Sequence, residues 1–263
     1  MDPTLQRLAI LVGEETLNSL SKSHVAVFGL GGVGSWCAEA LVRSGINEIT
    51  LVDSDRVAIS NINRQLPALF GTVGELKAEV LAERLHSIRE GVTVHVRASL
   101  YSQETRDIFT WDAYDYVVDA IDSLTHKIDL LAYASERGCT VFSSLGAAGK
   151  LDPTKVRSVS IWKTAGCPLG KLVRGGLRKR GFSGDFVAVY SEELSRMGFL
   201  AADRGVCETK GNSIKQTVLG SFVSVTATFG MTLASLVVQD ALKRSKSGVN
   251  SNARSLIENC NEI

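Results

Sequence analysis

The sequence lacks the features that mark secreted, membrane-spanning and thiolate-zinc proteins. Its five scattered cysteines form no Cys-x-x-Cys pair, which argues against a structural zinc clip. Their odd number fits a reducing compartment better than a disulfide framework. No apolar run approaches the ~18 residues of a membrane span. The first residues, Met1-Asp2-Pro3-Thr4, lack the pattern of a signal peptide. We therefore expect a cytoplasmic protein without a membrane partner.

The chain also has almost no net charge, +1 at pH 7, so it is not a polycation as a whole. Its charge is nevertheless uneven along the sequence, because one segment holds six basic residues and no acidic one. These are Lys163, Lys171, Arg174, Arg178, Lys179 and Arg180. The segment suggests a polyanionic partner, although composition alone fits a solvated basic face equally well.

One further motif is missing: no G-x-x-x-x-G-K-[ST] occurs, which excludes a P-loop kinase. A different glycine turn is present. An apolar run over residues 25–28 is followed by Gly29, Gly31, Gly32 and Gly34, then by a helical pattern over 36–44 and a second apolar run that ends on Asp53. Glycines let a backbone approach a phosphate at a helix start, and an acid about 20 residues on can bind ribose hydroxyls. This order predicts a nucleotide site.

The remaining pattern alternates strands with helices, which predicts an α/β fold with a Rossmann-like, doubly wound, mainly parallel sheet. We expect further strands over 92–98, 116–122, 139–144, 156–162 (antiparallel) and 186–190. We expect helices over 5–20 (one or two), 75–89, 103–110, 125–137, 167–179 and 214–243. A loop over 191–212 and a frayed polar tail from Ser245 complete the prediction. The long apolar helix is rich in small residues and could also lie at a subunit interface.

Ligands of such sheets bind at the carboxyl ends of the strands. Asp53, Asp119, Asp122 and the loop over 146–149 all fall at those ends, so we expect them to converge on one site.

The glycine turn alone would also fit a dehydrogenase, but the residues beyond it favour a triphosphate. Arg64 and Lys77 follow the second strand, and Lys77 lies where the helix dipole disfavours a cation unless an anion is bound nearby. Two cations suit phosphates, and the carboxylate of Asp122 suits a magnesium ion. ATP with Mg²⁺ is therefore the expected cofactor pair. A binding module that keeps the fold without catalysis is a third alternative, and it has no need of these three charges around one cleft.

Five motifs in order resemble the ubiquitin-activating-enzyme-like adenylating superfamily. They are Gly29-Leu-Gly-Gly-Val-Gly-Ser35, Asp53-Ser-Asp55, Asn61-Ile-Asn-Arg-Gln65, Lys77 and Asp119-Ala-Ile-Asp122. The resemblance implies that the glycines, Asp53, Asp55, Asn61, Asn63, Arg64, Gln65 and Lys77 bind ATP. It also implies that Asp122 holds magnesium, and that Arg7 reaches into the site of a neighbouring subunit in a homodimer. Arg64, Lys77, Asp122 and Arg7 would then be the catalytic set.

Within that superfamily, the runs Gly-Gly-Val-Gly-Ser-Trp, Leu-Gly-Ala-Ala-Gly-Lys-Leu-Asp-Pro-Thr and Val-Thr-Ala-Thr-Phe-Gly resemble the tRNA threonylcarbamoyladenosine dehydratase branch. That branch uses ATP to activate a threonyl carboxylate on tRNA, so tRNA becomes the expected partner of the basic segment, and a sulfur-transfer system is a further candidate partner. Residues 1–150 would form the ATP-binding domain and 151–263 a tRNA-contacting extension packed on the same sheet.

The alternative within the superfamily is an adenylyltransferase that activates the C-terminal carboxylate of a ubiquitin-like sulfur carrier. Such activators usually have two Cys-x-x-Cys pairs, which this chain lacks. Some members of the superfamily carry a cysteine where this chain has Lys215. Cys207 lies nearby, and we expect it to have no catalytic duty, because ring closure requires no thiolate.

Overall fold

A seven-stranded sheet forms the centre of the computed structural model, which describes residues 2–195 and 220–260. The strand order is β3-β2-β1-β4-β5-β7-β6, and every neighbouring pair is parallel except β6 with β7. The strands are β1 (His24–Phe28), β2 (Glu48–Val52), β3 (Thr93–Arg97), β4 (Tyr116–Asp119), β5 (Thr140–Ser144), β6 (Val156–Ser160) and β7 (Val187–Ser191). The prediction of a doubly wound, mainly parallel sheet is confirmed.

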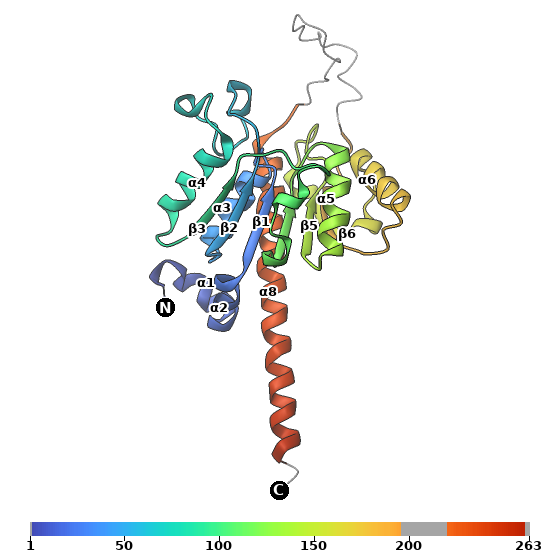
Figure 1. Ribbon diagram of the computed structural model, residues 1–263. Helices are drawn as coiled ribbons and strands as arrows, with labels where there is room; N and C mark the ends of the chain where they lie inside the picture. Colours follow the sequence, from blue (N-terminus) through green and yellow to red (C-terminus); the bar gives the residue numbers. More distant parts are fainter. Residues whose placement is uncertain (1, 196–219, 261–263) are drawn as a thin grey trace, which may run out of the picture.

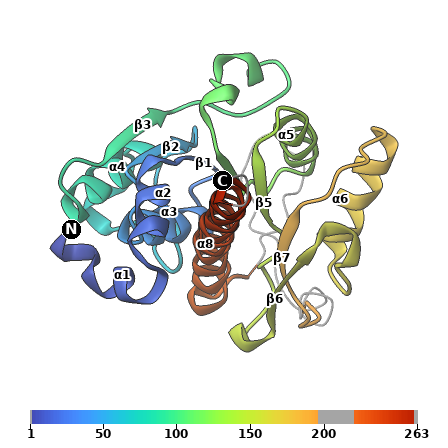
Figure 2. The ribbon, with the colours of Figure 1, turned by 90° about the horizontal axis from the view of Figure 1, so that it is seen from below.

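Helices cover both faces of this sheet. They are α1 (Gln6–Val12), α2 (Glu14–Lys22), α3 (Gly34–Arg43), α4 (Lys77–Ile88), α5 (Leu124–Glu136), α6 (Pro168–Lys179) and α8 (Val223–Cys260). Figure 2 shows α3, α4 and α8 on one side of the strands and α5 and α6 on the other. Alternate strand residues divide accordingly, since Val25 and Val27 join the core under α3 and α8, whereas Ala26 and Phe28 join the core under α5 and α6.

The carboxyl ends of the central strands are aligned by their register. Phe28, the last residue of β1, pairs with Val52 of β2 and with Asp119 of β4. The chain leaves β1 toward β2 on one side, and β4 lies on the other side, so the strand order reverses between β1 and β4. This is the position at which open α/β sheets bind ligands.

Helices α1 and α2 lie at the opposite edge of the sheet, where β1 begins (Figure 1). The glycine Gly13, with φ +86°, separates them as the interrupted pattern predicted. Leu5 and Leu17 pack there against Gly45.

Helix α8 differs from its prediction at both ends. It begins at Val223 rather than near residue 214, and it continues to Cys260 where a frayed tail was expected; its lower half projects beyond the sheet (Figure 1). By length and composition, Val223–Ser247 could cross a membrane, contrary to the reading that no such run exists. Phe229, Leu233 and Val237 are nevertheless fully buried against the sheet and α3, as in a core helix.

The small residues of α8 have the packing role that the sequence suggested. A Cβ atom on Gly230 would lie 2.4 Å from the carbonyl oxygen of Val33, which precedes α3. Helices α3 and α8 therefore approach each other closely at the start of α3.

Two predicted elements are shorter because side chains bond to the local backbone. The helix expected over 103–110 is only a 3-10 turn at Arg106–Ile108, where Thr105 donates to the carbonyl of Leu100 and accepts from the N–H of Ser102. The strand expected to reach Asp122 ends at Asp119, whose carboxylate accepts from the N–H of Ile121. Such local bonds compete with the helix and strand hydrogen bonds.

Candidate functional site

Two glycines of the turn after β1 are required by the fold itself. Gly29 has φ +87°, and a Cβ atom there would lie 2.6 Å from the carbonyl oxygen of Ala120, just after β4. A Cβ atom on Gly34 would lie 1.8 Å from the carbonyl oxygen of Gly29. The turn can therefore close against β4 only with glycine at both positions.

Gly31 has no such internal reason to be glycine. Its φ is not positive, and the nearest atom to an added Cβ is Nε2 of Gln65 at 3.7 Å, an ordinary contact. Gly32 is tighter, with Cγ of Arg64 and Oγ1 of Thr226 each 3.2 Å from an added Cβ. A glycine that the protein does not need for its own packing fits a position where the backbone meets a ligand.

Asp53 is tied to the glycine turn by its carboxylate. Oδ2 accepts from the N–H of Leu30 at 2.7 Å, and Oδ1 accepts from the N–H of Asp55 at 2.8 Å. Burial raises the pKa of Asp53, while these two hydrogen bonds and Lys77 oppose the rise. The bonds fix the carboxylate beside the turn, and each oxygen retains a lone pair for a ribose hydroxyl.

Lys77 is the first residue of α4 and its side chain is buried. Its Nζ lies 2.7 Å from Oδ2 of Asp55, an exposed carboxylate two residues after Asp53. The expected position of Lys77 in the first turn of a helix is thus confirmed. A cation in the first turn of a helix is disfavoured by the helix dipole. Within the protein, the carboxylate of Asp55 offsets this effect for Lys77.

The crossover between β2 and α4 brings Arg64 to the glycine turn. The indole N–H of Trp36, at the start of α3, donates to the carbonyl of Arg64 at 3.0 Å. The Arg64 guanidinium donates to the carbonyl of Ser60 at 2.8 Å and to Oδ1 of Asn63 at 2.9 Å. These acceptors are weak partners for a guanidinium compared with an anion, so the side chain is available to a phosphate.

The side-chain amides of Asn61, Asn63 and Gln65, in the connection between β2 and α4, make different contacts. Oδ1 of Asn61 accepts from the N–H of Ala58 at 3.1 Å, and Nδ2 of Asn63 donates to the carbonyl of Ser221 at 3.1 Å, next to α8. Both bonds shape the crossover. Gln65 is buried beside Gly31, and its Oε1 has no hydrogen-bond partner among the described residues. Such an orphaned acceptor marks a place that a ligand or a water completes.

The two acids that follow β4 do not share one role. Asp119 is fully buried, with Oδ2 at 2.5 Å from Nζ of Lys127 and at 2.6 Å from Oγ of Ser143. It therefore holds α5 to the sheet and does not join the site, contrary to the expectation of convergence. Asp122 is exposed beyond the turn. Lys127, which has this structural partner, was missed by the sequence analysis.

The loop over 146–149 does lie on the site side of the sheet. The N–H of Gly149 donates to the carbonyl of Gly220 at 2.8 Å, next to Ser221, which contacts Asn63. Gly146 in turn contacts Cys167 at the start of α6. Trp36 bonds to the carbonyl of Arg64, and Thr226 lies beside Gly32. Neither contact could be predicted from the sequence, because the partners are far apart along the chain.

Arg7 is exposed on α1, at the far edge of the sheet from the glycine turn. Within one chain it does not join the site.

The six basic residues of the segment 163–180 fall into two groups. Arg174 donates to the carbonyl of Thr164, Arg178 lies over the ring of Trp162, and Arg180 donates to Asp129 of α5 at 2.6 Å. Lys163, Lys171 and Lys179 are exposed. Helix α6, predicted over 167–179, is confirmed at Pro168–Lys179.

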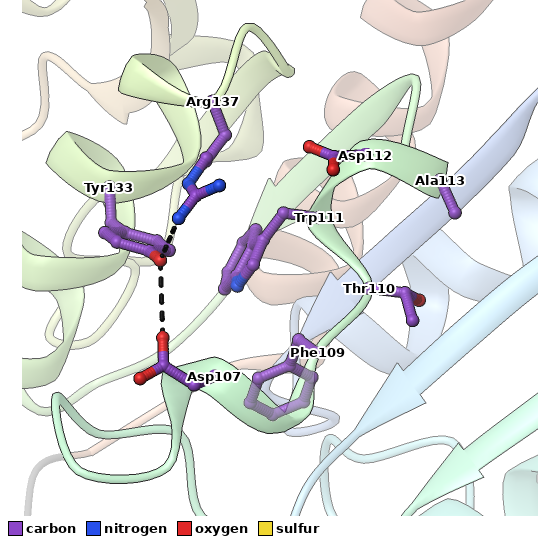
Figure 3. Close-up of a pocket in the computed structure, with 8 residues that line it drawn as sticks. All are labelled: Asp107, Phe109, Thr110, Trp111, Asp112, Ala113, Tyr133 and Arg137. Carbon is purple, nitrogen blue, oxygen red and sulfur yellow. Dashed lines mark hydrogen bonds between the residues drawn. The ribbon is translucent and has the colours of Figure 1, made fainter.

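Two buried cysteines and one surface pocket do not add to the site. Burial raises the pKa of the Cys37 and Cys139 thiols, which disfavours the reactive thiolate. Cys207, Lys215 and most of the predicted loop lie outside the described residues. A cavity of about 570 Å³ lies between residues 107–113 and α5, where the Tyr133 hydroxyl bonds to Arg137 and Asp107 (Figure 3). It includes none of the predicted site residues.

The glycine turn, Asp53, Lys77 and Arg64 therefore lie together at the carboxyl edge of the sheet, where open α/β sheets bind ligands. The model of the ThiF family matches residues 5–259, so the chain belongs to the ThiF family. The tRNA threonylcarbamoyladenosine dehydratase of Haemophilus influenzae is 39% identical over 239 residues, which are 88% of this chain and 90% of that protein. The crystal structure of the E. coli tRNA N6-threonylcarbamoyladenosine dehydratase with ATP is 34% identical, has a TM-score of 0.79, and covers 95% of this chain and 98% of that chain.

A carrier-activating relative matches over a shorter length. The sulfur carrier protein adenylyltransferase of Thermus thermophilus is 36% identical over 113 residues, 43% of this chain and 41% of that protein. Similarity to the dehydratases of Haemophilus influenzae and E. coli extends over 88% of this chain in the first case and 95% in the second.

Proposed function

We propose that the protein is an ATP-dependent tRNA threonylcarbamoyladenosine dehydratase. The observation that carries the proposal is the grouping of the glycine turn, Asp53, Lys77 and Arg64 at one edge of the sheet. The near full-length similarity to dehydratases supports this acceptor over a carrier protein.

The site residues would act mainly on the nucleotide. Asp53 receives the ribose hydroxyls, and the backbone at Gly31 approaches the phosphates. A carboxylate oxygen of the substrate attacks a phosphorus atom of ATP and breaks its P–O bond to the leaving group, which is pyrophosphate for attack on the α-phosphorus and ADP for attack on the γ-phosphorus. Lys77 and Arg64 neutralise the charge that develops on the phosphates in this step. The carbamoyl group then closes the ring on the activated carbonyl carbon. The carboxylate oxygen leaves with the phosphorus group, so the nucleoside loses one water.

Asp122 is the residue that fits a magnesium ion. It is an exposed carboxylate just beyond β4, whereas Asp55 is paired with Lys77 and Asp119 with Lys127. Magnesium supplies charge neutralisation of the phosphates when bound. The rest of the neutralisation comes from Arg64 and Lys77.

Arg7 and the basic segment would extend the site beyond one chain. Since Arg7 lies at the far edge of its own sheet, it contributes only in a homodimer, by reaching the site of the partner. The exposed Lys163, Lys171 and Lys179 contact the tRNA phosphates. A tRNA substrate and the free cysteines Cys37, Cys139 and Cys167 favour a cytoplasmic localisation.

The test is mass spectrometry of nucleosides from tRNA carrying threonylcarbamoyladenosine, after incubation with the protein, ATP and magnesium. We expect a nucleoside lighter by one water, formed only when ATP is present. A parallel assay measures ATP–pyrophosphate exchange with a ubiquitin-like carrier protein. Exchange stimulated by the carrier, with no change in the tRNA nucleoside, would overturn the proposal in favour of a carrier adenylyltransferase.

A further inference from the structure

A second cluster of ligating side chains lies toward the amino edge of the sheet, where β1 and β2 begin beside the middle of β3. His24 starts β1, Glu48 starts β2 in register with it, and His95 is the third residue of β3. In a parallel sheet, paired residues project from the same face, which here is the face of α5. The three side chains thus come from three adjacent strands and meet although 71 residues of sequence separate the first from the last (His24 to His95).

The ligating atoms are as close as a single metal ion requires. Nδ1 of His24 lies 3.5 Å from Oε1 of Glu48, and Nε2 of His95 lies 2.9 Å from the same oxygen. Nitrogen and oxygen ligands of a tetrahedral zinc ion are about 2.0–2.1 Å from the metal, so they are about 3.3 Å apart. One ligand atom from each residue lies within 4.8 Å of the other two.

The surroundings orient the ligands as a metal site does. Nε2 of His24 is 2.8 Å from Oγ1 of the buried Thr50, which leaves Nδ1 to face Glu48. The ring of Tyr114 packs edge-on against His24 at 4.9 Å between centroids. Such outer contacts fix the tautomer and the ring plane of ligating histidines.

Charge and access also fit a cation. The Glu48 carboxylate lies 3.5 Å from Nδ1 of His24, and Oδ2 of Asp115 accepts from the backbone N–H of His24 at 2.9 Å. His95 and Glu48 have side chains 37% and 45% exposed, so solvent reaches the cluster and can supply a fourth ligand.

From these contacts we propose that His24, Glu48 and His95 bind one divalent cation of the zinc class and that this ion fastens the amino ends of β1 and β2 to the middle of β3. Two imidazoles and one carboxylate favour zinc over magnesium, which takes oxygen ligands. The site lies at the opposite edge of the sheet from the glycine turn, so its role is structural and is independent of the nucleotide chemistry. The lack of Cys-x-x-Cys pairs argues against a thiolate zinc site and has no bearing on a site made of histidines and a carboxylate.

The test is titration of the chelator-treated full chain with Zn²⁺, by calorimetry and by thermal unfolding. We expect one Zn²⁺ per chain and a rise in the thermal midpoint of about 5 °C at a hundred times the dissociation constant. His95→Ala and Glu48→Gln change partly exposed side chains, so both variants should fold, and each should weaken binding by about a hundredfold or more. Thr50→Val, which removes only the orienting hydroxyl, should weaken it about tenfold. Mg²⁺ should not compete.

His86→Ala is the matched control, because His86 is exposed on α4 away from the cluster. It should bind Zn²⁺ as the parent protein does. Co²⁺ as a probe should give the visible bands of a tetrahedral nitrogen–oxygen site without a thiolate charge-transfer band. Unchanged affinity in both His95→Ala and Glu48→Gln, or a thiolate band, would overturn the proposal and place any bound metal elsewhere.

Discussion

At the carboxyl edge of the sheet, Arg64, Gln65 and Asp53 surround a glycine turn, whereas at the amino edge His24, Glu48 and His95 contact one another. Among the described residues, Oε1 of Gln65 at the carboxyl edge has no hydrogen-bond partner, and the Arg64 guanidinium donates to a carbonyl and an amide oxygen. The amino edge has a contact of 2.9 Å between Nε2 of His95 and Oε1 of Glu48, and Thr50 orients His24. The first edge has room for a large anion, and the second has the spacing for a small cation.

The parallel register explains why both edges hold such groups. Because β1, β2 and β4 are aligned, the residues after each strand meet at one edge and the residues that begin the strands meet at the other. The long crossover between β2 and α4 carries Arg64 and Gln65 to the carboxyl edge. At the amino edge, the segment between β3 and β4 brings Tyr114 and Asp115 to His24, whose ring also faces Glu48.

The largest effect is expected from a residue at the carboxyl edge that serves the fold. Lys127→Met should leave Asp119 buried without its cation and lower the free energy of unfolding by about 3–5 kcal/mol. The measurement is denaturant unfolding of the variant against the parent. The double variant Asp119→Asn/Lys127→Met should recover part of the loss. A single variant as stable as the parent would show that Asp119 is not a structural group and would return it to the site.

Arg64→Ala should break the chemistry and leave the fold intact. Removal of one cation from the developing phosphate charge should lower the cyclisation rate by about 10²–10³-fold, with an unchanged thermal midpoint. The measurement is single-turnover conversion of tRNA carrying threonylcarbamoyladenosine. The control is Arg137→Ala, which changes an exposed arginine at the C-terminal end of α5. This variant should cyclise the tRNA at the parent rate.

Arg7 offers a sharper form of the same experiment. If it acts in the partner's site, Arg7→Ala and Arg64→Ala should each be defective alone. A mixture of the two should regain activity, because one site of the mixed dimer has both arginines. A mixture as inactive as its components would remove Arg7 from the catalytic set.

Alanine variants of Gly34 and Gly31 should differ, because the first is expected to lower stability and the second to weaken ATP binding. Gly34→Ala forces a Cβ atom into the carbonyl of Gly29 and should cost about 2 kcal/mol or more of stability. Gly31→Ala meets no protein atom closer than 3.7 Å, so it should fold normally and bind ATP more weakly. Thermal unfolding and equilibrium ATP binding distinguish them. Normal ATP affinity in a folded Gly31→Ala protein would refute the close approach of a ligand at this position.

The smallest effect is expected on tRNA binding, from the exposed lysines of the basic segment 163–180. Replacing Lys163, Lys171 and Lys179 together by alanine should weaken tRNA binding about tenfold at low salt. It should also reduce the slope of log affinity against log salt concentration by about 3. Lys22, Lys155 and Lys243 provide a control triple of basic residues outside the segment. An unchanged slope would show that these lysines do not contact tRNA phosphates and that the segment is only a solvated basic face.

Part of this arrangement was readable from the sequence, because local patterns specify local structure. The glycine spacing, the apolar runs around it and the acid at Asp53 predicted β1, the turn, α3 and β2 with small errors at their ends. The errors elsewhere arose where side chains override the pattern, as at Thr105, which replaces a helix by a 3-10 turn. The end of β4 was misplaced for the same kind of reason, since the Asp119 carboxylate caps the following turn.

Contacts between side chains that are distant in the sequence could not be predicted from local patterns. Asp119 and Asp122 are both acids at the end of one strand, and only burial distinguishes the structural group from the exposed one. Nothing near Lys127 in the sequence indicates that its amine reaches Asp119 and the carbonyl of Ser144.

The sequence by itself determined the sheet, the glycine turn and the residue types that a nucleotide needs, because these depend on periodicity and on backbone freedom at a few positions. Only the tertiary structure decided which charged groups are available. Whether a carboxylate or an imidazole is paired, orphaned or free to bind an ion depends on the strand register, which brings together residues that are far apart along the chain.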